Sequence, residues 1–397
     1  MSADEPVAPS SVTDRLLGLT GRHAALRERV ERLAREHVVP VLAESDAAER
    51  MPLDVFRAFG AAGLLGGTLP REYGGAAMSN VELAVMCEEV GRWSQPIAGF
   101  IGGVSTVFGV GLLRFGSEAQ RQRYLVPYAR GVTTGALALT ESRSGSDTAG
   151  ISCSARRVDG GWVLDGEKAW IDNAAGADWV LAFAQSDSAL GRKGICAFIV
   201  ERGTAGFTTH EYKNKQAWRV SPVGGVRFEN CFLPESALVG EPGGGYRVAL
   251  ASVGYGRLQV AARHCGGLRT CLDESVSWSR ERKLYGKAIA EFQLIQTKIV
   301  DMSIALDTGR FLTYRFAHML DEGQMARREG SMAKVYTAEA LMRSTHDAVQ
   351  IQGARAIAGE SLVGRMFRDA KVSEIVEGAN EVQRTLVAEY ELGIRAA

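Results

Sequence analysis

The spacing of apolar residues divides the chain into three stretches of different character. From about Val12 to Tyr128, apolar positions recur three and four residues apart, as on one face of an amphipathic helix. Leu26, Val30 and Leu33 form one such stripe, and Pro40 ends it. The first stretch is therefore predicted to be helical.

The middle stretch, from about Gly131 to Glu241, has the pattern of β structure. Short runs rich in Val, Phe, Trp and Ile, such as WVLDG, WVLAFAQ and ICAFIV, are separated by Asp-Gly, Asn-Ala and glycine-rich turns. No pattern of helical length lies between these runs. We therefore expect antiparallel strands in a compact barrel or sandwich, and not a parallel sheet with alternating helices.

A helical pattern returns after Gly243 and continues to the C-terminus. Long segments are predicted at about 246–283, 292–322 and 327–352, and a shorter one follows Glu381. Four helices with short connections predict an antiparallel bundle.

The expected fold class is therefore α+β. It combines an N-terminal all-α domain at residues 1–130, a central antiparallel β-barrel or sandwich domain at 131–243, and a C-terminal four-helix bundle at 244–397.

Composition narrows the classes of function. Lys plus Arg and Asp plus Glu number 46 each, and this zero net charge argues against nucleic acid as a main partner. We find no run near the roughly 18 apolar residues of a membrane span, so none is expected. The polar start, MSADEPVAPSSVTD, lacks the pattern of a secretion signal and is expected to be a short disordered leader.

The six cysteines show neither CxxC spacing nor histidine neighbours at the spacing of metal ligands. We expect them to be reduced and packed as small hydrophobic residues, with no metal site. These features together predict a cytoplasmic protein.

Two segments of the middle stretch could carry chemistry. Residues 138–147 place Thr140, Ser144 and Ser146 at a strand-to-turn junction, where hydroxyls and backbone N–H groups could bind an anion or a carbonyl. An ordinary polar turn would have the same residues. Trp170 ends a strand and is either a core residue or a surface on which a planar cofactor stacks.

Two more segments lie in the C-terminal stretch. Arg280, Arg282 and Lys283 close a helix, where the helix dipole favours cations; a phosphate site is the sharper alternative, because Arg binds phosphate oxygens in bidentate fashion. Glu377 stands between an apolar pair and Gly378. It is either a solvated helix end or, if partly buried, a candidate general base.

The order and spacing of these segments resemble the acyl-CoA dehydrogenase family over nearly the whole chain. The family motifs LTEPxAGSD, WITN, RKxFG, YRDAK and IYEGT correspond here to LTESRSGSD, WIDN, RKLYG, FRDAK and IVEGA. PREYGG, FGSEAQRQRYL and AEFQLIQTKIVDM also match. The resemblance implies an FAD-dependent acyl-thioester dehydrogenase with the three domains predicted above, usually a homotetramer or dimer.

The resemblance also implies roles for single residues. Glu377 would be the catalytic base, removing the α-proton while a hydride passes from the β-carbon to flavin N5. Arg282, on a neighbouring subunit, would pair with the FAD pyrophosphate. Ser146, Arg257 and Gly378 would line the path of the thioester substrate. The residues implied for FAD are Leu139, Thr140, Glu141, Trp170, Ile171, Asp172, Arg282, Phe292, Gln293, Gln350, Gly353, Ala379 and Glu381.

Several positions depart from the family pattern. Asp172 replaces a Thr whose hydroxyl donates to flavin N5, and Ala379 replaces a Thr that touches FAD. The usual Gly-Gly-x-Gly loop is here residues 353–356, with sequence GARA. Some members carry the base just before a conserved Arg in the bundle; this position is Gly256, so Glu377 has no rival there.

Three departures, namely LTESRSGSD at 139–147, YGR at 255–257 and GAR at 353–355, resemble members from polyketide and peptide natural-product pathways, which often oxidise acyl groups on carrier proteins. Oxidation of a hydroxyacyl-carrier-protein for polyketide extender units is one such reaction. A flavin-dependent oxygenase or oxidase on the same fold is an alternative motivated by Asp172, and a non-catalytic binding homologue is another. The expected partners are an acyl-CoA or acyl-carrier-protein thioester and an electron acceptor.

Overall fold

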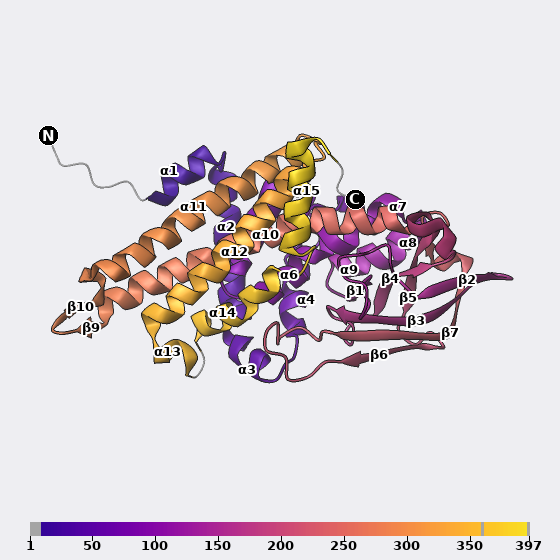
Figure 1. Cartoon of the computed structure of the whole chain (residues 1–397), viewed down its shortest axis with the longest axis horizontal. Helices are drawn as coiled ribbons and strands as arrows, with labels where there is room; N and C mark the ends of the chain where they lie inside the picture. The colour runs from indigo at the N-terminus through magenta and orange to yellow at the C-terminus, as the bar shows by residue number, and fades with distance from the viewer. Residues whose placement is uncertain (1–8, 359–360, 395–397) are drawn as a thin grey trace. The chain divides into compact units, whose positions relative to one another are not determined.

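The computed structural model describes residues 9–358 and 361–394 (Figure 1). Contacts divide the chain into two compact units, neither of them continuous in sequence. The helical unit comprises Met1–Pro40, Ser79–Gly99 and Arg257–Ala397, and the β unit comprises Val41–Met78 and Phe100–Gly256. The boundaries expected after residues 130 and 243 stay a prediction.

The helical unit is built from long helices with apolar inner faces. Helices α11 and α12 run alongside each other (Figure 1) and share a core with α10 and α14 that includes Leu268, Met302 and Leu341. The helices are α1 (Pro9–Leu16), α2 (Gly21–Leu33), α5 (Asn80–Gly91), α11 (Gln293–Asp321), α12 (Arg327–Gln352), α13 (Ala354–Ile357), α14 (Leu362–Ser373) and α15 (Asn380–Leu392), while α6 (Gln95–Gly103) and α10 (Gly245–Glu281) have residues in both units.

Local sequence sets where these helices begin. Ser79 caps α5: its hydroxyl accepts from the Glu82 N–H at 3.1 Å, and the Glu82 carboxylate accepts from the Ser79 N–H at 2.8 Å. Ser361 caps α14 by accepting from the Gly364 N–H at 3.2 Å. Segments expected at 246–283, 292–322 and 327–352 match α10, α11 and α12 closely.

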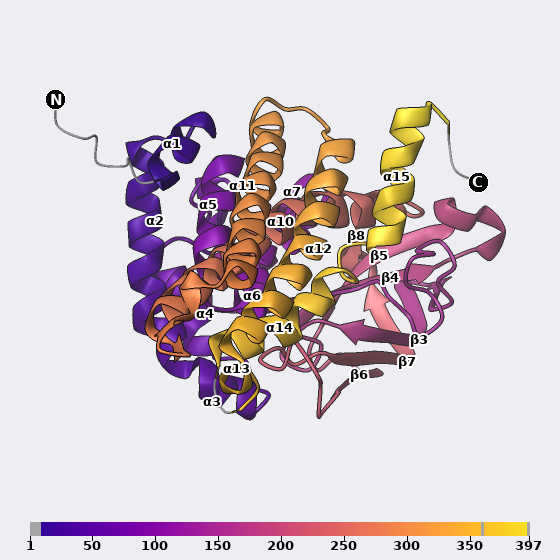
Figure 2. The ribbon, with the colours of Figure 1, turned by 60° about the vertical axis from the view of Figure 1, so that its left-hand side comes forward.

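The β unit contains an eight-stranded sheet in its described residues, in the order β6-β7-β3-β2-β4-β5-β8, with β1 paired to β4. Strands β3 and β7 lie side by side (Figure 2). The strands are β1 (Gly135–Ala138), β2 (Ser154–Val158), β3 (Gly161–Ile171), β4 (Trp179–Gln185), β5 (Ile195–Glu201), β6 (Phe207–Glu211), β7 (Gly224–Pro234) and β8 (Leu238–Val239).

Apolar side chains fill one side of this sheet. Trp162 and Phe198 meet edge to face with ring centroids 5.5 Å apart, and Leu164, Val180 and Phe228 pack around them. The helices of this unit are α3 (Leu42–Ala47), α4 (Leu53–Ala61), α7 (Gly109–Phe115), α8 (Glu118–Gln120) and α9 (Val126–Ala129). A two-stranded hairpin, β9 (Lys283–Leu284) with β10 (Lys287–Ala288), belongs instead to the helical unit.

Short 3-10 or π-helical segments connect many of these elements. They are η1 (Ala34–Val38), η2 (Val39–Val41), η3 (Arg71–Tyr73), η4 (Val104–Phe108), η5 (Arg121–Leu125), η6 (Ser188–Gly194), η7 (Glu235–Ala237) and η8 (Ile289–Glu291).

Three expectations about these elements need correction. The pairings of β1 and β2 with β4 are parallel, so the sheet is mixed and not wholly antiparallel, because long connections allow a strand to return in the same direction. Helix α14 was not predicted, although its buried residues Val363, Met366 and Ala370 recur at spacings of three and four. The leader expected at residues 1–14 is helical from Pro9, while residues 1–8 lie outside the described part.

One helical stretch bears on the expectation that the chain has no membrane span. The stretch Gln95–Phe115 has a mean hydropathy of 1.8 and, by length and composition alone, could cross a membrane. Scattered Ser, Thr and Gly residues interrupt its apolar run. Since 89% of the tested window is buried inside the protein, the stretch has the character of a core helix. The six cysteines are free and buried, as expected.

Within the helical unit, α5 and α10 cross in direct backbone contact. A Cβ atom on Gly266 would lie 2.0 Å from the Glu88 carbonyl oxygen, and one on Gly91 would lie 2.4 Å from that of Arg263. The Gln95 amide donates to the carbonyls of Gly91 and Arg263, both at 2.9 Å. Only glycine permits this approach.

Helix α5 also buries two carboxylates, which point to different neighbouring helices. Glu88 accepts from the Tyr314 hydroxyl at 2.7 Å and pairs with Arg310 at 3.1 Å. Glu89 pairs with Arg27 and Arg269, each at 3.0 Å. These buried pairs connect α5 with α2, α10 and α11.

We expect Gly266→Ala to lower the midpoint of urea unfolding, because the methyl group would force α5 and α10 apart at a cost of about 1–3 kcal/mol. Gly254→Ala, in the same helix, is the control: its Cβ would meet nothing within 4 Å. The midpoint, followed by circular dichroism, should not fall in the control. An unchanged midpoint in Gly266→Ala would contradict the close crossing.

Candidate functional site

The residues implied for cofactor and substrate fall in both units, and each group is described within its own unit. In the β unit, β1 runs into a turn formed by Leu139, Thr140 and Glu141. Lys168 of β3 lies buried against this turn and donates to the Leu139 carbonyl at 3.1 Å. The Ala169 N–H donates to the Thr140 carbonyl at 3.0 Å. The adjacent strand therefore fixes the backbone of this turn.

The Glu141 carboxylate is held inside the protein, with 5% of the residue exposed. It accepts from Lys168 Nζ at 2.8 Å, from the Ser152 N–H and hydroxyl at 2.7 and 2.6 Å, and from the Cys153 N–H at 2.9 Å. Burial acts to raise the Glu141 pKa, but the Lys168 charge and these hydrogen bonds outweigh it and lower the pKa. A contact of Glu141 with FAD would therefore come from its backbone.

Trp170 lies on the surface of the β unit, so the alternative that it is a core residue is wrong. It is 63% exposed, with a left-handed φ of 60°. The register of β3 against β7 shifts between Lys168 and Ile171, and such a bulge turns one side chain outward. Ile171 remains buried, while the Trp170 ring lies 4.6 Å from that of Tyr212, centroid to centroid. An exposed indole face suits the stacking of a planar ring.

Asp172 lies two residues after Trp170 and accepts hydrogen bonds. Its Oδ1 accepts from Trp218 Nε1 at 3.3 Å and from the Ser221 hydroxyl. The carboxylate thereby ties the end of β3 to the 218–221 segment. A carboxylate in this role acts as an acceptor, unlike the threonine that it replaces.

The turn after Glu141 is held by its own hydrogen bonds. The Ser144 hydroxyl donates to the Asp147 carbonyl, and Asp147 Oδ1 accepts from the N–H groups of Ala149 and Gly150, both at 3.2 Å. Ser146, implied for the substrate path, lies exposed on this turn.

In the helical unit, Glu377 lies half-buried on the turn between α14 and α15. Glu377 and Gly378 both have left-handed φ angles, 54° and 87°. Glycine suits position 378 because of this φ, and a Cβ atom there would also lie 2.1 Å from Gln383 Nε2 and displace that side chain. Ala379 is the N-cap of α15 and makes no side-chain capping bond, and Glu381 lies exposed in its first turn.

A chain of buried polar side chains supports this turn. Arg257 Nη1 donates to the Ser331 hydroxyl at 3.2 Å, and that hydroxyl donates to Gln383 Oε1 at 2.8 Å. Gln383 Nε2 donates to the Glu377 carbonyl at 3.5 Å. Sequence reasoning singled out Arg257 but missed Ser331, Gln383 and Lys334, which bonds to the same turn.

Arg257 combines burial with an unsatisfied donor. Burial lowers the Arg257 pKa, and the Glu377 carboxylate opposes this shift. Its Nε is buried and finds no hydrogen-bond partner among the described residues. A buried guanidinium donor beside a carboxylate could bind a carbonyl or carboxylate oxygen of a ligand.

The remaining implied residues lie toward the ends of the long helices. Arg282, which precedes the β9–β10 hairpin, and Gln293 are exposed, while the Phe292 ring lies under Lys287 Nζ at 4.4 Å. The Ile289 N–H donates to the Arg282 carbonyl at 2.8 Å, which holds this group together. Gln350 and Gly353 lie exposed at the end of α12, where Gly353 has a φ of 65°.

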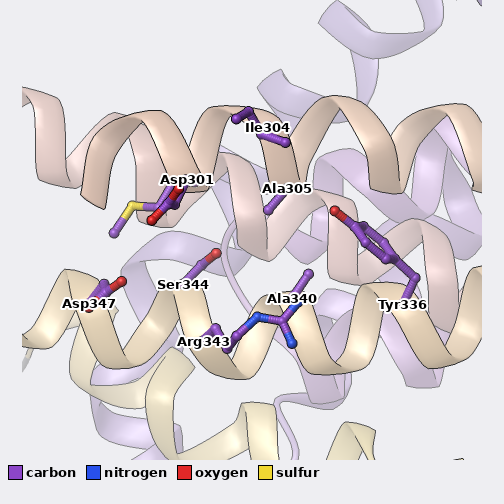
Figure 3. A pocket seen from close by; sticks show the side chains of 9 residues that line it. Asp301, Ile304, Ala305, Tyr336, Ala340, Arg343, Ser344 and Asp347 are labelled. Carbon is purple, nitrogen blue, oxygen red and sulfur yellow. The ribbon is translucent and has the colours of Figure 1, made fainter. Parts of the chain in front are cut away.

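A pocket of about 260 Å³ lies between α11 and α12 (Figure 3). Side chains of both helices line it: Asp301, Met302, Ile304, Ala305, Tyr336, Ala340, Arg343, Ser344 and Asp347. None of the residues implied for FAD or substrate is among them. It is therefore separate from the candidate site.

The described residues fit the implied flavin and the implied thioester in one respect each. The bulge exposes the Trp170 indole beside a turn whose backbone is fixed by Lys168. The helical unit offers a carboxylate, Glu377, and the unsatisfied donor of Arg257. No cluster of His, Cys, Asp and Glu suited to a metal ion occurs in the part of the chain that the structure describes.

Comparisons with known proteins agree with this arrangement. Models of the N-terminal, middle and C-terminal domains of acyl-CoA dehydrogenases match residues 20–132, 136–231 and 243–392. Human mitochondrial short-chain specific acyl-CoA dehydrogenase is 35% identical over 367 residues, covering 92% of this chain and 89% of the relative.

Solved structures are also similar. The prolyl acyl carrier protein oxidase AnaB is 28% identical with a TM-score of 0.90, covering 94% of this chain and 100% of that one. PigA with FAD and proline is 27% identical with a TM-score of 0.91, covering 95% and 99%. This chain belongs to the acyl-CoA dehydrogenase family, whose members are FAD-dependent oxidoreductases that act on CH–CH bonds.

Proposed function

We propose that this protein oxidises the Cα–Cβ bond of an acyl thioester and that Glu377 is the base. The observation that carries the proposal is the backbone of Glu377, whose left-handed φ of 54° is followed by a second left-handed residue. Such a φ costs a residue other than glycine roughly 1–2 kcal/mol. Strain of this kind persists where the surroundings enforce it, and it clusters at active sites.

Two buried cations support an ionised base. Arg257 and Lys334 both interact electrostatically with the Glu377 carboxylate. A positive charge near a carboxylate favours its charged form, which is the form able to accept a proton. Glu377 would take the α-proton of the thioester, so that the C–H electron pair stays on the substrate and forms the double bond.

The groups around the base would serve binding and orientation. FAD, when bound, supplies the acceptor for the hydride that leaves the β-carbon. Trp170 and the fixed 139–141 turn would hold the flavin, and the Glu377 N–H would donate to the thioester oxygen as negative charge develops there. Arg257 Nε, buried and unsatisfied among the described residues, would donate to an oxygen of the substrate.

The first substrate class that we propose is a short-chain acyl-CoA, because the human relative named above is a short-chain specific enzyme at 35% identity. The second is an acyl group on a carrier protein. AnaB motivates it as a carrier-protein oxidase of similar fold at 28% identity. The oxygenase alternative loses support because Asp172 accepts hydrogen bonds from Trp218 and Ser221, within a local structural network.

We also infer that Arg282, Phe292 and Gln293 act on the FAD of a second copy of the chain. The adjacent hairpin is strongly exposed, with Tyr285 at its tip 89% accessible. A homodimer or homotetramer would cover this surface. A cytoplasmic location remains part of the proposal.

Glu377→Gln should keep the flavin absorbance but lose reduction by substrate, because the amide cannot accept the α-proton. We expect the rate of anaerobic flavin bleaching by butyryl-CoA to fall at least about 100-fold. Glu374→Gln removes a carboxylate three residues earlier, paired with Lys371, and should keep most of the rate. Reduction of Glu377→Gln at the wild-type rate would rule out this base.

The same assay distinguishes the two substrate classes. Butyryl-CoA, isovaleryl-CoA and a prolyl-loaded carrier protein are each mixed with the wild-type enzyme under anaerobic conditions, and a dye serves as electron acceptor for turnover. Bleaching by the CoA esters supports the first class, and bleaching by the carrier protein alone supports the second. If neither bleaches the flavin, the proposed reaction is wrong for both classes.

Arg282→Ala should weaken FAD binding, because a guanidinium that pairs with phosphate oxygens is lost. We expect the dissociation constant, followed by flavin fluorescence, to rise by about 10-fold or more. Arg280→Ala removes the same charge two residues earlier and should leave FAD affinity near that of the wild type. Equal affinities in both variants would contradict the phosphate role of Arg282.

A further inference from the structure

We propose that Lys334 is a positioning residue for Glu377, and that its buried side chain fixes the turn which presents the carboxylate. The proposal rests on the proposed function, because it takes Glu377 as the base. It adds a residue of α12 that neither the sequence motifs nor the implied roles had included.

The contacts of Lys334 are specific to the turn. The residue is fully buried, at 0% exposure. Its Nζ donates to the Gly378 carbonyl at 2.9 Å and to Asn380 Oδ1 at 2.7 Å. These two acceptors lie on either side of Ala379, so a single ammonium group holds the turn immediately after Glu377.

Burying the Lys334 ammonium group against neutral oxygens costs free energy, so some interaction must offset this cost. An ammonium group taken out of water is normally compensated by a carboxylate in contact. Here both hydrogen-bond partners are neutral oxygens, and burial lowers the Lys334 pKa to about 8. A methionine would fill similar volume without desolvating a charge, so the hydrogen bonds to the turn are the evident gain.

The hydrogen bond to Gly378 acts where the backbone is least favourable. Glu377 and Gly378 are consecutive left-handed residues, and the Gly378 carbonyl follows the second of them. A charge-assisted donor on that carbonyl favours this backbone conformation over those with negative φ at Glu377. Loss of the donor would therefore let the carboxylate sample other positions.

Neighbouring groups extend the support from Lys334 in two directions. Asn380 Nδ2 donates to Glu339 Oε1 at 3.3 Å, and Glu339 pairs with Arg384 at 2.7 Å. Ser331, one turn before Lys334 on α12, holds Gln383, which donates to the Glu377 carbonyl. One face of α12 thus supports the turn directly through Lys334 and, by way of Ser331 and Gln383, at the Glu377 carbonyl.

The charges around Lys334 predict a pH dependence. It faces Glu377 and Glu374 from the turn, which raise its pKa, and Arg263 and Arg257 from α10, which lower it. His264 of α10 is also near and is neutral, because burial lowers its pKa far below the usual range. Lys334 therefore loses its proton as pH rises through about 8, and its hydrogen bonds to the Gly378 carbonyl and to Asn380 then lose the charge that strengthens them and holds the turn.

The test compares Lys334→Met and Lys334→Arg with the wild type, using Lys371→Met as the matched control. Lys371 is an exposed lysine near the same turn that pairs with Glu374. The readouts are FAD content, the rate of anaerobic flavin reduction by butyryl-CoA from pH 6 to 10, and hydrogen exchange of the 374–380 segment by mass spectrometry.

We expect Lys334→Met to retain FAD while its reduction rate falls about 10- to 100-fold through misplacement of the base. The fall in rate near pH 8 should disappear, and exchange in the 374–380 segment should increase. Lys334→Arg, charged at every pH tested, should recover part of the rate and also lack the fall near pH 8. Lys371→Met should behave as the wild type in all three readouts.

The positioning role is wrong if Lys334→Met has the reduction rate, the pH profile and the hydrogen exchange of the wild type. This holds even if Glu377→Gln is inactive. Conversely, full reduction of Glu377→Gln would overturn the proposed function, and increased exchange in Lys334→Met alone would then show only that the lysine holds the turn. If Lys334→Met does not fold, Lys334→Arg decides: a wild-type fall in rate near pH 8 in that variant contradicts the proposal.

Discussion

A buried ammonium group must find oxygen atoms that accept its hydrogen bonds, and each unit meets this need at a turn that carries candidate site residues. In the β unit, Lys168 bonds to the Leu139 carbonyl and to Glu141. In the helical unit, Lys334 bonds to the Gly378 carbonyl and to Asn380. Since an unsatisfied buried charge is strongly destabilising, each lysine makes the shape of its turn a condition of folding.

The buried charges of Lys168 and Lys334 are compensated in different ways. Lys168 contacts a carboxylate that is itself held by Ser152 and Cys153, so the charges of the pair compensate each other within one hydrogen-bonded network. Lys334 has neutral acceptors, and the strongest opposite charge that acts on it is that of Glu377 on the same turn. The first arrangement suits a rigid backbone platform. The second arrangement lets the Lys334 charge act on the Glu377 carboxylate while its hydrogen bonds go to other groups.

Much of the fold could be predicted from the sequence, because long apolar periodicities mark helix faces directly. The ends of α10, α11 and α12 lie within a few residues of those expected. The family motifs also led to Trp170 and Glu377. The exposure of Trp170 depends on a register shift between β3 and β7, which no pattern in β3 alone reveals. Likewise, the spacing of apolar residues identifies the buried face of a helix but not the helix that packs on it. From the sequence, Lys334 and Glu88 therefore look like ordinary charged surface residues.

The glycine-backed crossing of α5 with α10 has a consequence for synthesis on the ribosome. Its two halves, Gly91 and Gly266, are separated by most of the β unit in the chain. The partners of the buried Glu88, Arg310 and Tyr314 of α11, are synthesised later still. Newly made α5 therefore exposes apolar and acidic side chains until the last third of the protein emerges. The β unit has no such delay, because all of it precedes residue 257.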